Sequence, residues 1–196
     1  MDPAILDPDI EPTPLQVQLA VLEQIENAIQ NELLEHAQEN RPVNAVAWIA
    51  RNLIELAVWT QHCVESPTNA RKFFNDCARD AAELLKMPDS FSKDPNFSFK
   101  ATRAELLQEA KEKGVHDLDE QFQATRDAAK AIGKREEFIW MNKLLSKFAH
   151  PTSLWIMTPH EEREPFRDMF AEGGRSNGQD ALKTIALFRE SMLTTK

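Results

Sequence analysis

Several residue types are scarce in this chain of 196 residues, and each shortage excludes a class of protein. The chain has no tyrosine, five glycines and two cysteines. No apolar run approaches the roughly 18 residues that a membrane-spanning helix needs. The first residues, MDPAILDPDIEP, are acidic, which is the opposite of a basic signal peptide. We therefore expect a helical protein of the cytoplasm.

The two cysteines, Cys63 and Cys77, lie within predicted helices and do not have metal-ligand spacing. In a reducing cytoplasm, both are expected to be buried thiols. The chain contains no HExxH, CxxC, P-loop or GxSxG pattern. The sequence therefore predicts no metal site and no cofactor.

Positive charge is absent from the first 40 residues, which contain nine of the 32 acidic residues and no lysine or arginine. The rest of the chain has 23 acids against 23 bases, so the net charge of -9 comes from the N-terminal part. This part is either a solvated acidic surface or a docking element for a basic surface, on this molecule or on a protein partner. No basic patch indicates nucleic-acid binding, and a homo-oligomer remains open.

The pattern of apolar residues predicts an all-α, up-and-down bundle of about six to seven helices. Residues 1–14 contain four prolines and four acids, and we expect a disordered or extended acidic arm there, before one helical domain at 15–196. The predicted helices cover, approximately, residues 15–38, 42–65, 66–85, 102–114, 117–132, 134–149 and 179–193.

Turn and capping residues set these boundaries. Ser66 and Pro67 predict a helix N-terminus, and Thr102 with Glu105 forms a capping-box pattern. Residues 87–102 have no helical period and are interpreted as a lid, a partner surface or a disordered loop. Residues 151–176 are expected to be mostly irregular, with EGGRSNG (172–178) as a loop. The third helix is expected to face the core with Ala70, Phe73, Phe74, Cys77, Ala81, Leu84 and Leu85.

The helix at 42–65 is apolar around most of its circumference, which is typical of a central, buried helix. Its one polar strip contains Arg51, Glu55 and His62, which lie within roughly 40° of one another at 100° per residue. Arg51 and Glu55 are four residues apart and can pair. The strip must face either solvent or an internal polar pocket.

A second polar edge follows the helix at 134–149, where Asn142, Ser146 and His150 recur every four residues. Pro151 disfavours helical geometry at His150, so the ring is expected to project from the last turn. The carbonyl groups of a helix C-terminus favour the imidazolium form, and a carboxylate such as Glu55 would favour it further.

These two polar edges form one candidate pocket if their helices face each other. The pocket would contain Arg51, Glu55, His62, Asn142, Ser146 and His150. Three interpretations remain open at this point: a satisfied structural set, a pocket for a small ligand or peptide, and a catalytic site.

Two stretches, residues 50–74 and 138–155, resemble an uncharacterised family of bacterial all-helical proteins. The resemblance rests on Arg51 and Glu55 in an early helix and on Ser146, His150 and Pro151 in a late one. It covers about 45 residues and implies a helical fold. The family has no established activity to carry over.

A looser resemblance is to the HEPN class of helical domains, which includes metal-independent ribonucleases with an arginine four to six residues before a histidine. At the corresponding positions before His150 this chain has Leu145, Leu144 and Lys143, and lysine does not reproduce the arginine fork on a phosphate. A ribonuclease would use His150 as acid or base and Lys143 or Lys147 as phosphate contacts. The first hypothesis is a non-enzymatic binding or interaction module, and the ribonuclease is its alternative.

Overall fold

The computed structural model describes residues 12–36, 41–94, 96–112, 114–115 and 123–194. The all-α prediction is confirmed, and no strand occurs in these residues. The helices are α1 (Pro14–His36), α2 (Val43–Glu65), α3 (Pro67–Leu84), a short 3-10 helix η2 (Asp89–Phe91), α4 (Phe99–Glu112), α5 (Thr125–Ala131), α6 (Arg135–Ala149), α7 (Ser153–Met157) and α8 (His160–Thr194).

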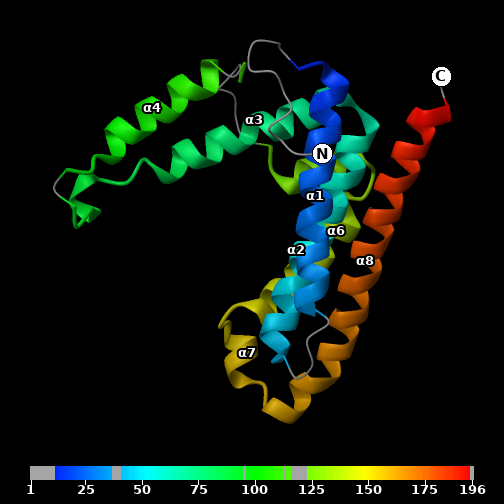
Figure 1. The fold of residues 1–196 in the computed structure, drawn as a ribbon. Coiled ribbons are helices and arrows are strands. Elements are labelled where there is room, and N and C mark those ends of the chain that lie inside the picture. Colours follow the sequence, from blue (N-terminus) through cyan, green and yellow to red (C-terminus); the bar gives the residue numbers. More distant parts are fainter. Residues whose placement is uncertain (1–11, 37–40, 95, 113, 116–122, 195–196) are drawn as a thin grey trace.

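Helix α2 forms the centre of the bundle, as its sequence predicts. It contacts α1, α3, α5, α6 and α8, and it buries residues on most of its circumference. Figure 1 shows α1, α2 and α8 running side by side along the long axis of the bundle. The largest fully buried side chains of the bundle include Phe170, Leu22, Ile29, Leu53 and Leu145.

Local capping signals explain several helix ends. The Ser66 hydroxyl accepts a hydrogen bond from the backbone N–H of Thr68, and Pro67 occupies the first turn of α3. At their C-terminal ends, α4 and α5 are followed by Gly114 (φ 75°) and Gly133 (φ 73°), respectively. A left-handed residue at this position lets the next backbone N–H bond back into the last turn, which glycine does at little cost.

The start predicted for α4 is wrong by three residues. The helix begins at Phe99, and its first turn is capped by Ser98, whose hydroxyl accepts from the backbone N–H of Ala101 at 3.2 Å. Thr102 therefore lies inside the helix instead of capping it. The loop predicted at 87–102 is shortened accordingly and contains the 3-10 helix η2. The predicted arm 1–14 lies almost wholly outside the described residues, as does the predicted start of α5 near Asp117.

The core face predicted for α3 is also wrong beyond its first two turns. Phe74, Cys77 and Leu84 are exposed, whereas Asp76 and Arg79 are buried. The reason is visible in Figure 1, where α3 leaves the bundle and pairs with α4 in a projecting hairpin. The second half of α3 thus faces α4, not the bundle core. The expectation of two buried thiols holds for Cys63 alone, and burial raises the pKa of that thiol to about 12.

Helices α7 and α8 contradict the mostly irregular segment predicted at 151–176, and α8 also contradicts the loop predicted at 172–178. One helix of 35 residues runs through both the glycine pair and Pro165. Gly174 and Gly178 are buried against α2, where a Cβ on Gly174 would lie 2.9 Å from the Cα of Ala50. Glycine at this spacing lets two helix backbones approach closely, so the residues that suggested a loop instead form a packing surface.

Candidate functional site

Arg51 joins the two polar edges that the sequence predicts. Its Nε donates a hydrogen bond to Asn142 Oδ1 at 2.7 Å and lies 3.1 Å from Glu55 Oε1. The side chains of Arg51 and Glu55 are 27% and 30% exposed, so the pair lies between bulk solvent and the core. Helices α2 and α6 therefore face each other in antiparallel orientation and share a polar link at this point.

His150 lies at the end of α6, as Pro151 predicts. Its backbone is extended (φ −115°, ψ 155°), and the ring is turned edge-on to Trp48 with the ring centres 5.6 Å apart. The residue is exposed. Within the described part of the chain no hydrogen bond or ion pair joins His150 to Arg51 or Glu55. The carboxylate partner predicted for His150 is therefore not in contact with it.

The other predicted residues of α6 differ in their exposure. Ser146 is half-buried beside the Arg51–Asn142 link, whereas Lys143 and Lys147 are exposed. The two lysines thus point to solvent on the outer side of α6, away from the contact with α2. They do not line a pocket shared with Arg51.

His62 is separated from the rest of the predicted set. Its ring is buried beside Trp59, and its Nε2 lies 3.1 Å from the amide nitrogen of Gln123. The Asn69 amide donates to the backbone carbonyl of His62 at 2.9 Å. Burial lowers the pKa of His62 below its usual 6.5, so a neutral ring accepts the hydrogen bond from Gln123. His62 therefore joins α2 to Asn69 of α3 and to Gln123 in the segment before α5.

A buried ion pair next to this histidine was not predicted. Asp76 pairs with Arg79 on α3, and the side chains are 4% and 6% exposed. The backbone N–H of Gln123 also donates to Asp76 at 3.3 Å. Burial, together with the nearby Asp76 carboxylate, raises the pKa of Asp80. The Asp-x-x-Arg spacing was visible in the sequence, but the apolar residues around it indicated a different buried face.

A cavity of about 240 Å³ lies between α2, α6 and α8, and neither Arg51 nor Asn142 lines it. Its apolar wall includes Ile54 and Val58 of α2 and Phe138 and Met141 of α6. The sequence did not predict this cavity, because Asn177, which lines it from α8, was expected in a loop. No local signal marks a space that three separate helices enclose.

Polar side chains surround the mouth of the same cavity. Gln61, Lys134 and Glu137 line it, and the structure assigns their side chains no hydrogen bond or ion pair among the described residues. The Asn177 amide donates to the carbonyl of Gly173 at 2.8 Å, which leaves its oxygen available. The cavity thus combines an apolar interior with uncommitted polar groups at its mouth, a common composition for a small-molecule site.

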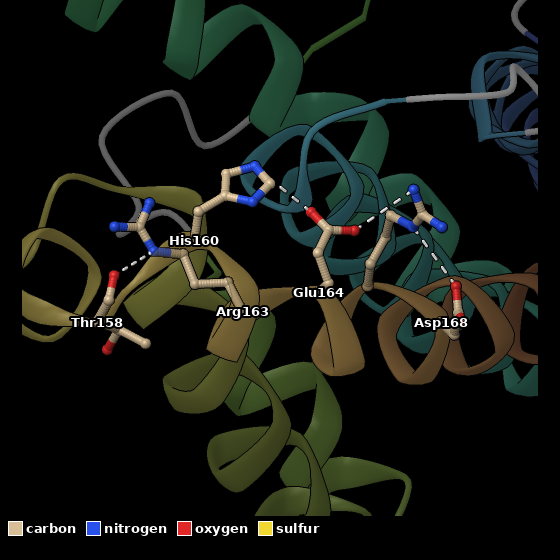
Figure 2. Close-up of polar contacts among 6 residues, drawn as sticks. Thr158, His160, Arg163, Glu164 and Asp168 are labelled. Carbon is tan, nitrogen blue, oxygen red and sulfur yellow. Dashed lines mark hydrogen bonds and ion pairs between the residues drawn. The ribbon is translucent and has the colours of Figure 1, made fainter.

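The first turns of α8 carry a further set of polar contacts, shown in Figure 2. Arg163 donates to the carbonyl of Thr158 at 2.7 Å, and its guanidinium lies 4.0 Å from the centre of the Trp155 ring. His160 and Glu164 lie one turn apart on the helix surface, with a nitrogen–oxygen distance of 3.7 Å. These contacts fix the corner between α7 and α8 and are largely exposed.

Two other kinds of feature are absent from the described residues, a metal site and a membrane-spanning helix. Across residues 12–36, 41–94, 96–112, 114–115 and 123–194, no group of three histidine, cysteine or acidic residues is placed to hold a metal ion. None of the described helices is both long and apolar enough to cross a membrane.

Comparisons with known proteins do not assign this chain to a family. No protein-family model, no curated protein and no solved structure matches the chain.

Proposed function

We propose that this protein is a non-enzymatic binding module of the cytoplasm, and that its ligand site is the α2–α6 seam. The observation that carries the proposal is the cavity of about 240 Å³ between α2, α6 and α8. A ligand that covers its wall of Ile54, Val58 and Phe138 removes apolar surface from water, which favours binding. Pockets for drug-sized ligands begin at about 300 Å³, which favours a smaller molecule here.

The Arg51 link supports a binding role over a catalytic one. Its contacts with Glu55 and Asn142 use the guanidinium to hold α2 and α6 at a fixed spacing. General acid–base catalysis needs a titratable group within hydrogen-bond reach of its partner. The exposed His150 has no such contact with Arg51 or Glu55 among the described residues. The polar set is thus better suited to fixing the spacing of α2 and α6 than to moving a proton.

The proposal is tested with indole, an apolar probe, and with methionine methyl groups as reporters. Met141 lines the cavity, whereas Met87 and Met169 lie on exposed surface away from it. In protein labelled with ¹³C at the methionine methyls, indole should shift the Met141 signal and leave the Met87 and Met169 signals unchanged.

A cavity-filling variant gives the matched comparison. Ala57 lines the cavity, and Ala57→Leu places three extra carbons there, whereas Ala186→Leu makes the same change on the exposed side of α8. We expect Ala57→Leu to abolish the Met141 shift and Ala186→Leu to retain it, with far-UV circular dichroism confirming that both fold. If indole leaves Met141 unmoved in the wild type, the proposed binding site is wrong.

The ribonuclease alternative has one supporting observation: Lys143, Lys147 and His150 are exposed along α6. We expect no cleavage when the purified protein is incubated with total RNA in the presence of a chelator. Cleavage by the wild type that is lost in His150→Ala would replace the binding module with a metal-independent ribonuclease.

A further inference from the structure

The mouth of the α2–α6–α8 cavity carries two opposite charges where α6 begins. Lys134 is the residue directly before α6, Glu137 lies in the first turn of that helix, and both line the cavity. Both are exposed, and the structure assigns neither an ion pair among the described residues. A cation and an anion are therefore both available at the entrance to an apolar space.

This charge arrangement discriminates between ligand classes. A simple carboxylate would be attracted by Lys134 and repelled by Glu137, and a simple amine would experience the reverse. A ligand with an ammonium and a carboxylate on one carbon can satisfy both at once. The small volume and the apolar wall of Ile54, Val58 and Phe138 then require a compact hydrocarbon group on that carbon.

Resting on the proposed function, we propose that the ligand of this cavity is a free α-amino acid with an apolar side chain. Its carboxylate faces Lys134, its ammonium faces Glu137, and its side chain enters the space between α2 and α6. The uncommitted amide of Gln61 and the oxygen of Asn177 add hydrogen-bond partners for the ammonium and carboxylate groups.

The test compares L-leucine with two analogues that each lack one charge. Leucinamide keeps the ammonium without the carboxylate and imitates a peptide N-terminus, and 4-methylpentanoate keeps the carboxylate without the ammonium. Affinities are measured from the Met141 methyl signal of the full chain. We expect L-leucine to bind about fivefold more tightly than either analogue, since an ion pair with an exposed side chain contributes at most about a factor of five.

Single substitutions assign each charge to its residue. Glu137→Gln should remove the preference for leucine over 4-methylpentanoate, and Lys134→Gln should remove the preference over leucinamide. Glu136→Gln and Lys130→Gln make the same changes at exposed neighbouring positions outside the cavity and should leave both preferences intact.

The outcomes separate this inference from the proposed function. The amino-acid assignment is overturned if leucine, leucinamide and 4-methylpentanoate bind equally well, or if both cavity variants keep the wild-type preferences. In either case, indole binding would still support the binding module. A leucinamide affinity equal to that of leucine points to peptide N-termini and also overturns it. If neither indole nor leucine moves the Met141 signal, both proposals fail together.

Discussion

At the scale of single residues, Arg51 links the two helices of the candidate site. It contacts Glu55 on its own helix and Asn142 on α6. The pairing of Arg51 with Glu55 follows from their spacing in the sequence, since residues four apart on a helix are neighbours. The partner on α6 does not follow in that way, because the axial register of two helices depends on all the side chains packed between them.

The contribution of this link can be measured by a double-mutant cycle. Arg51→Met and Asn142→Leu each remove one end of the 2.7 Å hydrogen bond, and the coupling free energy should be about 1 kcal/mol. Urea denaturation of the wild type, both single variants and the double variant gives this value. A parallel cycle of Arg51→Met with Lys147→Met should give no coupling. Strictly additive effects of Arg51→Met and Asn142→Leu would show that the hydrogen bond does not form in solution.

His62 makes a second prediction at this scale, and its sign follows from burial. The pKa of His62 is lowered from 6.5 in the folded protein, so the unfolded chain binds a proton that the folded chain does not. The stabilising contribution is therefore complete above pH 6.5 and is lost as the pH falls through 6.5 toward the folded pKa. The loss cannot exceed about 1.4 kcal/mol per pH unit.

The measurement compares the wild type with His62→Gln by urea denaturation between pH 5 and pH 8. The difference in unfolding free energy between the two proteins should shrink as the pH falls below 6.5. His150→Gln serves as the control, because His150 is exposed. Identical pH dependence in wild type and His62→Gln would contradict a buried, neutral His62.

At the scale of helices, glycine has two different roles in this protein: it ends some helices, and inside α8 it lets that helix pack closely against α2. Gly114 and Gly133 adopt positive φ and terminate helices, whereas Gly174 and Gly178 lie inside α8. The buried residues of α8 recur every three or four positions, which is a helical stripe that includes both glycines: Phe170, Gly174, Gly178, Ala181 and Ile185. That periodicity was present in the sequence, but the run EGGRSNG (172–178) was predicted to be a loop because of its glycine-rich composition.

Two alanine substitutions in α8 test this explanation. Gly174→Ala places a Cβ 2.9 Å from the Ala50 backbone, so we expect a loss of about 1–3 kcal/mol from the overpacked contact. Gly173→Ala has no atom within 4 Å of the new Cβ, and the higher helix propensity of alanine should stabilise it by up to about 1 kcal/mol. Thermal and urea denaturation check both values. A stabilising Gly174→Ala would mean that α8 does not approach α2 this closely.

At the scale of the whole molecule, the α3–α4 hairpin projects from the bundle, and among the described residues α3 supplies its main packing against α1 and α2. Helix α4 buries a single residue, Ala110, whereas α2 is buried on most of its surface. Figure 1 shows α4 extending away from α1, α2 and α8. Regions with few buried apolar contacts open at lower free energy than the core.

We therefore expect hydrogen exchange to divide the molecule into two parts. Amides of α4 (Phe99–Glu112) should exchange through local opening, at a free energy well below that of global unfolding. Amides in the middle of α2 should exchange only with global unfolding, and mass spectrometry of peptic peptides measures both. Equal protection of α4 and α2 would show that α4 is covered by something other than α3.

The acidic N-terminal region is also explained only by the whole molecule. Glu26 of α1 pairs with Arg189 of α8 at 2.7 Å, and Glu32 accepts a hydrogen bond from Asn52 of α2 at 2.9 Å. Part of the negative charge that the sequence assigns to the first 40 residues therefore serves contacts within the bundle. The arm before Pro12 lies outside the described residues, and its partner role stays a prediction.

The sequence by itself determined the features that depend on residues within one or two helical turns of each other. These are the all-α class, the central position of α2, the cap at Ser66 and Pro67, the helix ends at Gly114 and Gly133, and the extended backbone of His150 before Pro151. Capping, proline geometry and apolar periodicity act locally, so one chain segment is enough to predict them.

Only the tertiary structure decided the features that depend on how distant segments meet. Helix α8 is continuous because α2 packs against its glycines. Asp76 of α3 is buried where it pairs with Arg79 and accepts a hydrogen bond from the distant backbone N–H of Gln123. The cavity exists because residues of α2, α6 and α8 line it together. His62 lies outside the predicted pocket because it contacts Asn69 and Gln123 instead. Packing between helices is set by the fit of many side chains at once, which no local pattern records.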